Sequence, residues 1–473
     1  MNYRLAICLL AISFAVQFQR ARADESRPRI IVLTDITNEP DDQESLVRFL
    51  VYANEFEVEG LIATTSTWLR DRTSVKNIAD CVMAYDKVKP KLSQHAEGYP
   101  TKGHLDAVTS EGYPAFGMSG VGEGKDTEGS NRIIDVVDRE DPRPIWVTAW
   151  GGANCLAQAL WKVRETRTAD ELASFVSKLR VYTISDQDDS GPWMRREFPD
   201  LFFVVSPSGE RASEYQDATW TGISGDEYYL NGPGFKINMV SNEWLIKNVR
   251  EDHGPLGAMY PKWEYIMEGD TPSFMNLINN GLGSHVSPGY GGWGGRYFLK
   301  RIYGYPGKFW TNTRDAVATP DGKRHVGNTA TIWRWREDFQ RDFAARMDWC
   351  VKEPQEANHN PTAVLEGDAT KAVLHRSAKL GETIELTAEG SKDPDGNKLT
   401  YTWFHYPEAG RDLQSKHDLW NVPIENSNAA VCEVRIPEDL PKNKRNVHVI
   451  LKVTDDGTPN LCSYRRVILQ VGE

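Results

Sequence analysis

A run of apolar residues leads directly into a cluster of carboxylates near the start of this chain. The run 30–33 (IIVL) is followed by Asp35, Glu39, Asp41 and Asp42. Consecutive apolar residues predict a buried strand of a parallel sheet, and open α/β sheets bind ligands in the loops after such strands. Because neighbouring carboxylates repel one another, we expect a hard cation such as Ca²⁺, with a hydroxyl-rich ligand such as a sugar, to offset the repulsion.

The segment from residue 28 to about 350 alternates short apolar runs with helical patterns, which predicts βαβ units and a mostly parallel sheet. The expected strands cover residues 29–34, 58–63, 145–148, 181–184 and 201–206. The expected helices cover residues 42–54, 72–85, 153–164, 169–177 and 333–351. Carboxylates also follow the strand at 181–184, which indicates a pocket at the carboxyl edge of the sheet.

The periodicity changes to two beyond a polar linker, and this favours a small all-β domain of the immunoglobulin-like sandwich type, with Trp403 in its core. Its expected strands cover residues 383–388, 399–404, 447–453 and 466–471. The acidic segments 393–397 and 455–457 lie between strands, where turn chemistry is favoured over Ca²⁺ binding. The predicted division of the chain is a signal peptide at 1–23, an α/β domain at 24–352, a linker at 353–363 and a β domain at 364–473.

The first 23 residues have the pattern of a secretory signal. An apolar run at 5–12 precedes the A-x-A motif of residues 21–23, and the run is too short for an ordinary membrane span. We expect export to a periplasm or to the outside of the cell, with no membrane attachment after cleavage. Five cysteines would remain, so at least one thiol is unpaired, and the pairing of Cys432 with Cys462 is left open.

The net charge of −12 over 473 residues, without a long run of one sign, argues against nucleic acid and anionic membranes as partners. Four of the fifteen tryptophans, Trp68, Trp150, Trp193 and Trp293, lie beside glycine, proline or polar residues. Such rings serve either as platforms for sugars or bases or as core residues. The glycine-rich segment around Trp293 predicts either a loop that closes on a sugar or a tight crossing plugged by a buried ring.

The motifs at 33–42, 193–199 and 291–297 resemble those of a secreted cellulose-binding family that combines a nucleoside hydrolase-like domain with a small C-terminal β domain. In the wider nucleoside hydrolase superfamily, an aspartate-rich loop after the first strand holds Ca²⁺ and a ribosyl group. The resemblance covers nearly the whole chain after residue 23. It implies a nucleoside hydrolase-like α/β fold, a calcium site, and a carbohydrate or nucleoside-like small molecule as the partner.

The resemblance also implies roles for individual residues. The implied metal ligands are Asp35, Asp42, the backbone carbonyl of Trp150, and Asp270. An ungapped match puts Thr37 where the superfamily has an aspartate that binds the metal and serves as the presumed base, and a threonine hydroxyl cannot be that base near neutral pH. A loop longer by two residues would instead put Asp35 in the base position, with Glu39 as a second substitute.

The candidate substrate-binding residues combine positions matched by the resemblance, residues at strand ends and loop tryptophans. They are Asp41, Thr67, Trp68, Asn154, Asp186, Trp193, Arg195 and Trp293. Arg195, Arg196 or an aromatic neighbour is expected to assist departure of the leaving group. The superfamily's usual histidine before the late metal aspartate is replaced here by Gly269.

Two functions are consistent with this pattern. The first is hydrolysis of an N-glycosyl or related glycosyl bond, with a metal-assisted water that gives its proton to Asp35 or Glu39. The second is non-catalytic binding of cellulose or another polysaccharide through the pocket and exposed tryptophans. The changes at Thr37 and Gly269 favour the second function, whereas the density of carboxylates in the loop favours the first.

Overall fold

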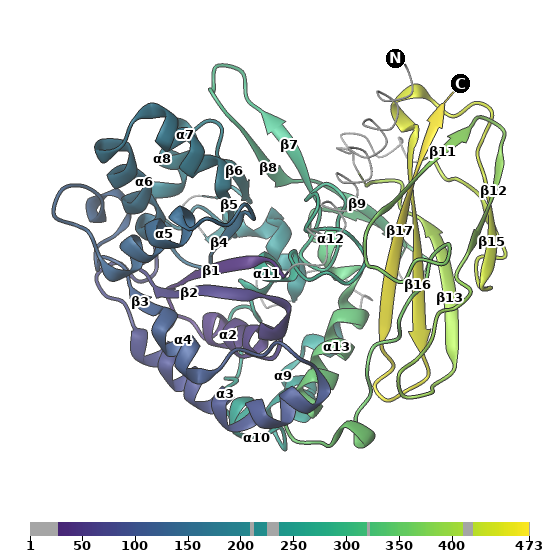
Figure 1. The fold of residues 1–473 in the computed structure, drawn as a ribbon, viewed down its shortest axis with the longest axis horizontal. Helices are drawn as coiled ribbons and strands as arrows, with labels where there is room; N and C mark the ends of the chain where they lie inside the picture. The colour runs from purple at the N-terminus through teal and green to yellow at the C-terminus, as the bar shows by residue number, and fades with distance from the viewer. Residues whose placement is uncertain (1–26, 209–211, 225–235, 319–321, 410–419, 473) are drawn as a thin grey trace, which may run out of the picture.

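The computed structural model describes residues 27–208, 212–224, 236–318, 322–409 and 420–472. An eight-stranded sheet organises the larger domain, with the strand order β3-β2-β1-β4-β5-β6-β8-β7 (Figure 1). All neighbouring strands are parallel except β7 and β8. The strands are β1 (Arg29–Thr34), β2 (Glu57–Ala63), β3 (Thr109–Glu111), β4 (Ile145–Ala149), β5 (Leu179–Thr183), β6 (Phe202–Val205), β7 (Tyr297–Arg301) and β8 (Lys308–Asn312). The expected mostly parallel sheet is therefore confirmed.

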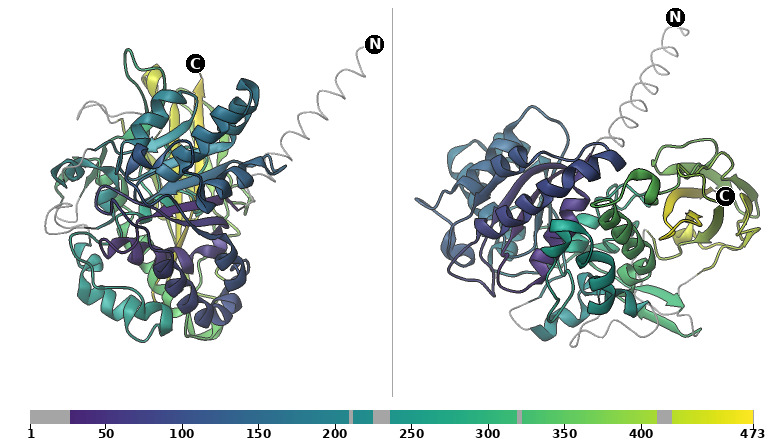
Figure 2. Two further views of the ribbon diagram at one scale, coloured as in Figure 1. Left: turned by 90° about the vertical axis from the view of Figure 1, so that its left-hand side faces the viewer. Right: turned by 90° about the horizontal axis from the view of Figure 1, so that it is seen from below.

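Helices cover both faces of this sheet (Figures 1 and 2). Successive side chains of β1 enter two different cores: Ile30 and Val32 pack on one face, and Ile31 and Leu33 on the other. This double burial explains the continuous apolar run. The helices are α2 (Asp41–Val51), α3 (Val75–His95), α4 (Lys102–Val108), α5 (Glu128–Asp138), α6 (Asn154–Thr166), α7 (Ala169–Lys178), α8 (Ser190–Glu197), α9 (Asn242–Leu245), α10 (Gly254–Ala258), α11 (Thr271–Met275), α12 (Ala330–Trp333) and α13 (Arg336–Asp348).

Two predicted helices differ from the observed ones in their extent. The helix expected at 72–85 continues to His95, because Val88 and Leu92 prolong its buried face and Pro90 is accommodated within it. The helix expected at 333–351 corresponds to the shorter α13, and Trp333 instead ends α12. Within the described residues, no helix is both long and apolar enough to cross a membrane. The predicted signal at 1–23 lies outside the described residues.

Two β-sheets form the C-terminal domain. One has the order β11-β17-β16-β13 and the other β12-β15-β14, and most neighbouring strands are antiparallel. Their facing side chains share one core that includes Trp403, as expected. The strands are β11 (Leu374–Lys379), β12 (Thr383–Thr387), β13 (Leu399–His405), β14 (Ile424–Glu425), β15 (Val431–Arg435), β16 (Asn446–Asp455) and β17 (Cys462–Gly472); a separate hairpin, β9 (Asp315–Ala318) and β10 (Arg324–Gly327), precedes α12.

Local interactions in the β domain account for its acidic turns and its cysteines. Asp393 accepts hydrogen bonds from the backbone amides of Asp395 and Asn397, as turn chemistry predicts. Cys432 and Cys462 are buried and free, as are the other cysteines of the described chain. The pairing that the sequence left open is therefore not formed.

The glycine-rich loop around Trp293 lies where the two domains meet. The Trp293 indole is only 2% exposed, and its Nε1 donates to the hydroxyl of Tyr464 on β17 at 3.5 Å. Arg466, also on β17, donates to the backbone carbonyls of Tyr290 and Gly291 at 3.0 and 3.1 Å. Trp293 is thus a buried plug at the domain contact, and the expectation that it binds substrate is corrected.

Candidate functional site

A cavity of about 690 Å³ opens at the carboxyl edge of the parallel sheet, where the loop after β1 meets the start of α11. We call it the acidic cavity. Five of its lining residues carry carboxylates, and no lysine, arginine or histidine appears among the described residues of its wall. The lining residues are Asp35, Asn38, Glu39, Asp41, Asp42, Trp68, Ile184, Gln187, Tyr215, Gln216, Trp220, Tyr265, Ile266 and Asp270.

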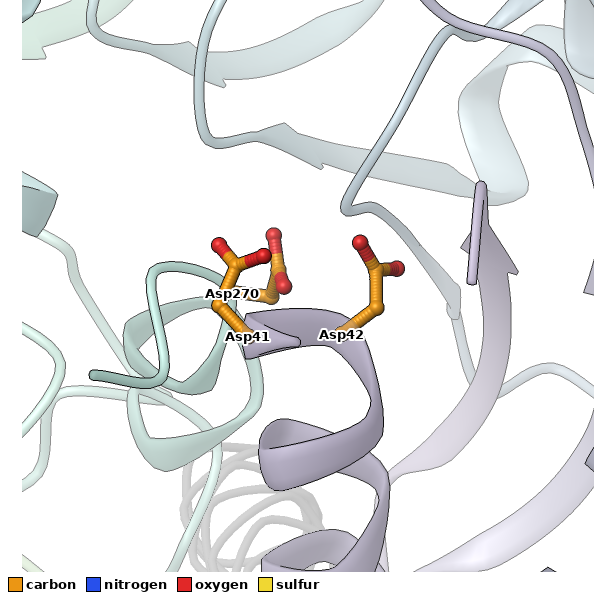
Figure 3. A group of neighbouring side chains, drawn as sticks. All are labelled: Asp41, Asp42 and Asp270. Carbon is orange, nitrogen blue, oxygen red and sulfur yellow. The ribbon is translucent and has the colours of Figure 1, made fainter. Parts of the chain in front are cut away.

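Helix starts and a strand end bring the carboxylates together. Asp35 follows β1 directly, Asp41 and Asp42 form the first turn of α2, and Asp270 immediately precedes α11. Figure 3 shows the side chains of Asp41, Asp42 and Asp270 extending to the same side of the first turn of α2. One oxygen atom from each of these three carboxylates lies within 4.8 Å of the others. Helix N-termini favour negative charge, so α2 stabilises part of this cluster.

Several carboxylate oxygens in this cluster are buried without a hydrogen-bond partner. Both oxygens of Asp270 and Oδ1 of Asp35 have none among the described residues, although each side chain is almost fully buried. The hydroxyl of Thr34, by contrast, donates to Oδ1 of Asp42. An unsatisfied buried polar group costs roughly 1–3 kcal/mol, and more if it is charged. A set of hard oxygen donors with unused lone pairs fits Ca²⁺, which takes carboxylate ligands.

Burial and mutual repulsion shift the titration of these groups. Burial, reinforced by the charges of Glu39 and Asp35, raises the pKa of Asp41 to about 8. Burial and the neighbouring aspartates hold the pKa values of Asp42 and Asp270 well above the usual range, and burial raises the pKa of Glu39 to about 6. The cluster therefore resists full ionisation by itself, and a bound cation would relieve both causes.

The loop after β1 distinguishes the two possible matches to the superfamily pattern. Thr37 is exposed, has a backbone φ of +109°, and is not part of the cavity wall. Asp35 is 3% exposed and lies in the wall beside Asp42. Glu39 also lines the cavity, and its side chain is half-buried. Two carboxylates of this loop, and not Thr37, therefore lie in the cavity wall.

Gln187 contacts the backbone carbonyl of Trp150, which is an expected metal ligand. The Trp150 side chain is fully buried, and its backbone carbonyl accepts a hydrogen bond from Nε2 of Gln187 at 2.7 Å. Gln187 rather than Trp150 lines the cavity, and its Oε1 is buried without a partner among the described residues. Sequence analysis missed Gln187, although it lies among the carboxylates that follow the strand expected at 181–184.

Aromatic side chains form another part of the cavity wall. Trp68 is 41% exposed and meets Tyr215 edge to face, with ring centroids 6.5 Å apart. Tyr215 in turn contacts Trp220, whose Nε1 donates to Oγ of Ser185 at 3.0 Å. The prediction for Trp68 agrees with this placement. Trp220 and Tyr215 were missed, although Trp220 precedes Thr221-Gly222, a setting like that of the tryptophans that were selected.

Three predicted substrate-binding residues lie outside the cavity wall, on or near α8. Arg195 forms a bidentate ion pair with Asp186 at 2.8 and 2.9 Å, and both side chains are about nine-tenths buried. Trp193 packs edge to face on Phe198, with centroids 5.5 Å apart. The ion pair joins α8 to the segment after β5, and none of the three residues lines the cavity, so this placement does not support the expected roles of Asp186, Trp193 and Arg195 in substrate binding.

Two further predicted residues also make hydrogen bonds within the protein. Asn154 donates to the carbonyl of Ala115 at 2.7 Å and is 1% exposed. The Thr67 hydroxyl accepts a hydrogen bond from Arg70 at 3.2 Å. Both side chains support the loops behind the cavity and do not line it.

Close packing explains the absence of a histidine before Asp270. A Cβ atom at Gly269 would lie 2.8 Å from Oδ2 of Asp41 and 3.1 Å from the Trp220 ring. A larger residue would displace the carboxylate or the indole. Trp220 and Gly269 are therefore matched to each other in this chain.

Comparison with known proteins agrees with this architecture. The family model described as "Cellulose-binding Sde182, nucleoside hydrolase-like domain" matches residues 29–297, and the model "Cellulose-binding protein Sde0182, C-terminal domain" matches residues 383–471. A solved nucleoside hydrolase-related hypothetical protein from Saccharophagus degradans, described as associated with carbohydrate metabolism, is 38% identical, with a TM-score of 0.78. That alignment covers 94% of this chain and 100% of the other.

The remaining comparisons add less. The effector protein XOO4466 is 10% identical over 72% of this chain and 99% of its own. Its TM-score of 0.35 is too low to support a conclusion about this chain. The search of curated proteins gives no match. The first family model spans more than half of the residues, and the Saccharophagus structure is similar over nearly the whole length. The chain therefore belongs to the cellulose-binding Sde182 family, whose larger domain is nucleoside hydrolase-like.

Proposed function

We propose that the acidic cavity is the active site of a calcium-dependent hydrolase that acts on an N-glycosyl or related glycosyl bond. The observation that carries this proposal is the convergence of Asp35, Asp41, Asp42 and Asp270 in one cavity, with buried oxygens that no described group of the protein satisfies. Retaining such a cluster is costly unless a ligand offsets the repulsion. We also propose that the protein is exported, on the basis of its first 23 residues.

Each wall of the cavity has a chemical task in this proposal. Asp35, Asp42 and Asp270 would hold the Ca²⁺ ion, and Gln187 supplies a further unused oxygen. When bound, the ion would orient the hydroxyls of a sugar and make a water molecule more acidic. Asp41, at the first turn of α2, is placed to accept hydrogen bonds from those hydroxyls. The exposed face of Trp68 provides a platform for the ring of the substrate.

Two carboxylates can take the proton from the attacking water. Asp35 is one of the proposed metal ligands, so its substitution would affect calcium binding as well as turnover. Glu39 lines the cavity but is not one of the proposed metal ligands. Because Arg195 is paired with Asp186, an oxocarbenium-like transition state would rely on the aromatic wall around Trp68 to assist the leaving group.

The second candidate function is non-catalytic carbohydrate binding in the same cavity. It is favoured by the exposure of Thr37 and by the tight packing at Gly269, which leave the superfamily's usual base and histidine without direct equivalents. In that case the carboxylates would bind a cation and sugar hydroxyls, and Trp68 would stack on a sugar ring, without bond cleavage.

The test combines calorimetry with a hydrolysis assay on the chain lacking residues 1–23. Calcium is titrated first, and ribose, nucleosides and cello-oligosaccharides are then added to the calcium-loaded protein. Glu39→Gln should keep calcium binding and lose hydrolysis, whereas Asp35→Asn should lose both. Asp138→Asn, which removes an exposed pair with Arg167, is the matched control and should change neither.

Each outcome separates the two candidate functions. Calcium binding with cleavage of a glycosyl bond supports the hydrolase. Calcium and sugar binding without cleavage of any substrate favours the non-catalytic function. Absence of calcium binding overturns the metal-assisted hydrolase.

A further inference from the structure

A second cavity, of about 540 Å³, lies between the hairpin β7–β8 and the four-stranded sheet of the C-terminal domain. We call it the neutral groove. Unlike the acidic cavity, it has no aspartate, glutamate, lysine or arginine among its described lining residues. Its volume lies within the range of about 300–1,000 Å³ that is typical of small-molecule sites.

One wall of the groove is polar because of the register of the sheet. Asn446 on β16 pairs with Gln470 on β17, and His448 pairs with Ile468. Side chains two residues apart on a strand share a face, so these four residues lie on the face opposite to the core valines and leucines of the same strands. The two amide side chains are exposed and make no hydrogen bond within the described part of the chain.

The imidazole of His448 belongs to the same wall and is buried more deeply than the two amides. It is 2% exposed, and its Nδ1 lies 2.9 Å from a guanidinium nitrogen of Arg466. A guanidinium can only donate, so Nδ1 is the acceptor of this hydrogen bond. The charge of Arg466 is directed at this ring and at the carbonyls of Tyr290 and Gly291, and Arg466 does not itself line the groove.

The opposite wall is apolar. Leu299 on β7 is paired with Trp310 on β8, and both side chains line the groove together with Tyr290. Leu299 is 40% exposed. An aromatic and aliphatic wall thus faces a wall with amides and two histidines, and the described lining residues include no aspartate, glutamate, lysine or arginine.

We propose that the neutral groove binds a neutral β-linked glucan chain. A pyranose ring presents C–H groups on its faces, which suit Trp310 and Tyr290, and hydroxyls at its edges, which suit the amides of Asn446 and Gln470. Anionic ligands would find no lysine or arginine in the described wall, and cations would find no carboxylate. This inference is independent of the proposed hydrolase, because it concerns another cavity and requires no metal.

The test is calorimetric titration of cellohexaose into the chain lacking residues 1–23, with EDTA present so that the acidic cavity holds no calcium. We expect one binding event. Trp310→Ala should weaken it about tenfold or more, as is usual for a central aromatic contact. The double variant Asn446→Ala/Gln470→Ala should weaken it severalfold. Trp193→Ala, which replaces a tryptophan outside both cavities, is the matched control and should bind like the unsubstituted protein.

The two groove variants differ in how much they can disturb folding, so together they test binding even if one of them is misfolded. Trp310 is half-buried beside Phe202, so its replacement can disturb folding, whereas the two amides are exposed and lie outside the core. Failure of the unsubstituted protein to bind millimolar cellohexaose overturns the proposal. Unchanged binding by the amide double variant also overturns it, as does loss of binding in Asp270→Asn, which would place the glucan in the acidic cavity. Failure of calcium binding or of hydrolysis leaves this result unaffected, so the two proposals fail separately.

Discussion

The acidic cavity and the neutral groove are similar in volume, about 690 and 540 Å³, but they are built from different parts of their sheets. The acidic cavity uses the ends of parallel strands and the first turns of helices, where Asp35, Asp42 and Asp270 converge. The neutral groove uses the face of a sheet, where Asn446 and Gln470 stand side by side across two antiparallel strands.

The difference shows how the position of a site on a sheet governs its chemistry. At strand ends, helix N-termini favour negative charge, and loops can direct several carboxylates at one point. On a sheet face, the period of two sets side chains in rows, and rows of amides and aromatic rings suit an extended neutral chain. The first arrangement concentrates charge on one small region of a ligand, and the second distributes weak contacts along it.

The strongest test of this contrast is Asp270→Asn. Both oxygens of Asp270 are buried without described partners, and an amide brings no charge to the cation. Calcium affinity depends strongly on the number of charged ligands, so we expect a loss of at least about 100-fold in calorimetry. Cellohexaose binding in EDTA should stay within about twofold. Equal calcium affinity in Asp270→Asn and Asp138→Asn would contradict the assignment of the metal site.

Calcium should also stabilise the fold. A ligand present at about 100 times its dissociation constant, and bound only by the folded state, adds roughly 2.7 kcal/mol to the free energy of unfolding. We expect denaturant titrations to show this gain with calcium and its loss with EDTA. Asp270→Asn should show the same stability in both conditions. A gain in Asp270→Asn equal to that of the unsubstituted protein would mean that calcium binds elsewhere.

Trp68→Ala tests the aromatic wall of the acidic cavity. Trp68 is 41% exposed, so its removal should disturb little core packing. Stacking of a base on an aromatic ring is worth about 1–3 kcal/mol, and we expect the affinity for the best nucleoside or sugar to fall about tenfold, with calcium affinity unchanged. Trp193→Ala should change neither affinity. A parallel loss of cellohexaose binding in EDTA would indicate that the two cavities are not independent.

Part of the acidic cavity was predictable because Asp35, Asp41 and Asp42 come soon after β1, and parallel strands end at one edge of a sheet. Asp270 follows no strand, and its place in the cavity was predicted only from the family resemblance. Gln187 and Trp220 were missed because their placement depends on contacts between distant loops. Asp186 was assigned to the cavity because it follows the strand at 181–184, and Arg195 because it lies in the motif at 193–199. Only the structure shows that they pair with each other.

The neutral groove was not predictable from the sequence. Trp310 and Asn446 are 136 residues apart, and neither lies in a motif with a chemical signature. The alternation of β16 and β17 indicates which residues share a face, but not which part of the larger domain lies against that face. The domain contact decides this, through Trp293, Tyr464 and Arg466.

The smallest expected effect concerns Thr37, where the two possible matches to the superfamily pattern differ. Thr37 has a φ of +109°, which is unfavourable for a β-branched residue and readily adopted by glycine. Thr37→Gly should therefore raise the free energy of unfolding by up to about 1 kcal/mol, measured by denaturant titration. Thr37→Ala keeps a Cβ atom and should give little of this gain.

Calcium binding by the same two variants tests the alignment of the loop. Because Thr37 is exposed and outside the cavity wall, both variants should bind calcium as tightly as the unsubstituted protein. A weaker calcium affinity in Thr37→Ala would show that the hydroxyl reaches the ion after a rearrangement of the loop. Unchanged affinity, together with the loss expected for Asp35→Asn, would assign the role of the superfamily's second aspartate to Asp35.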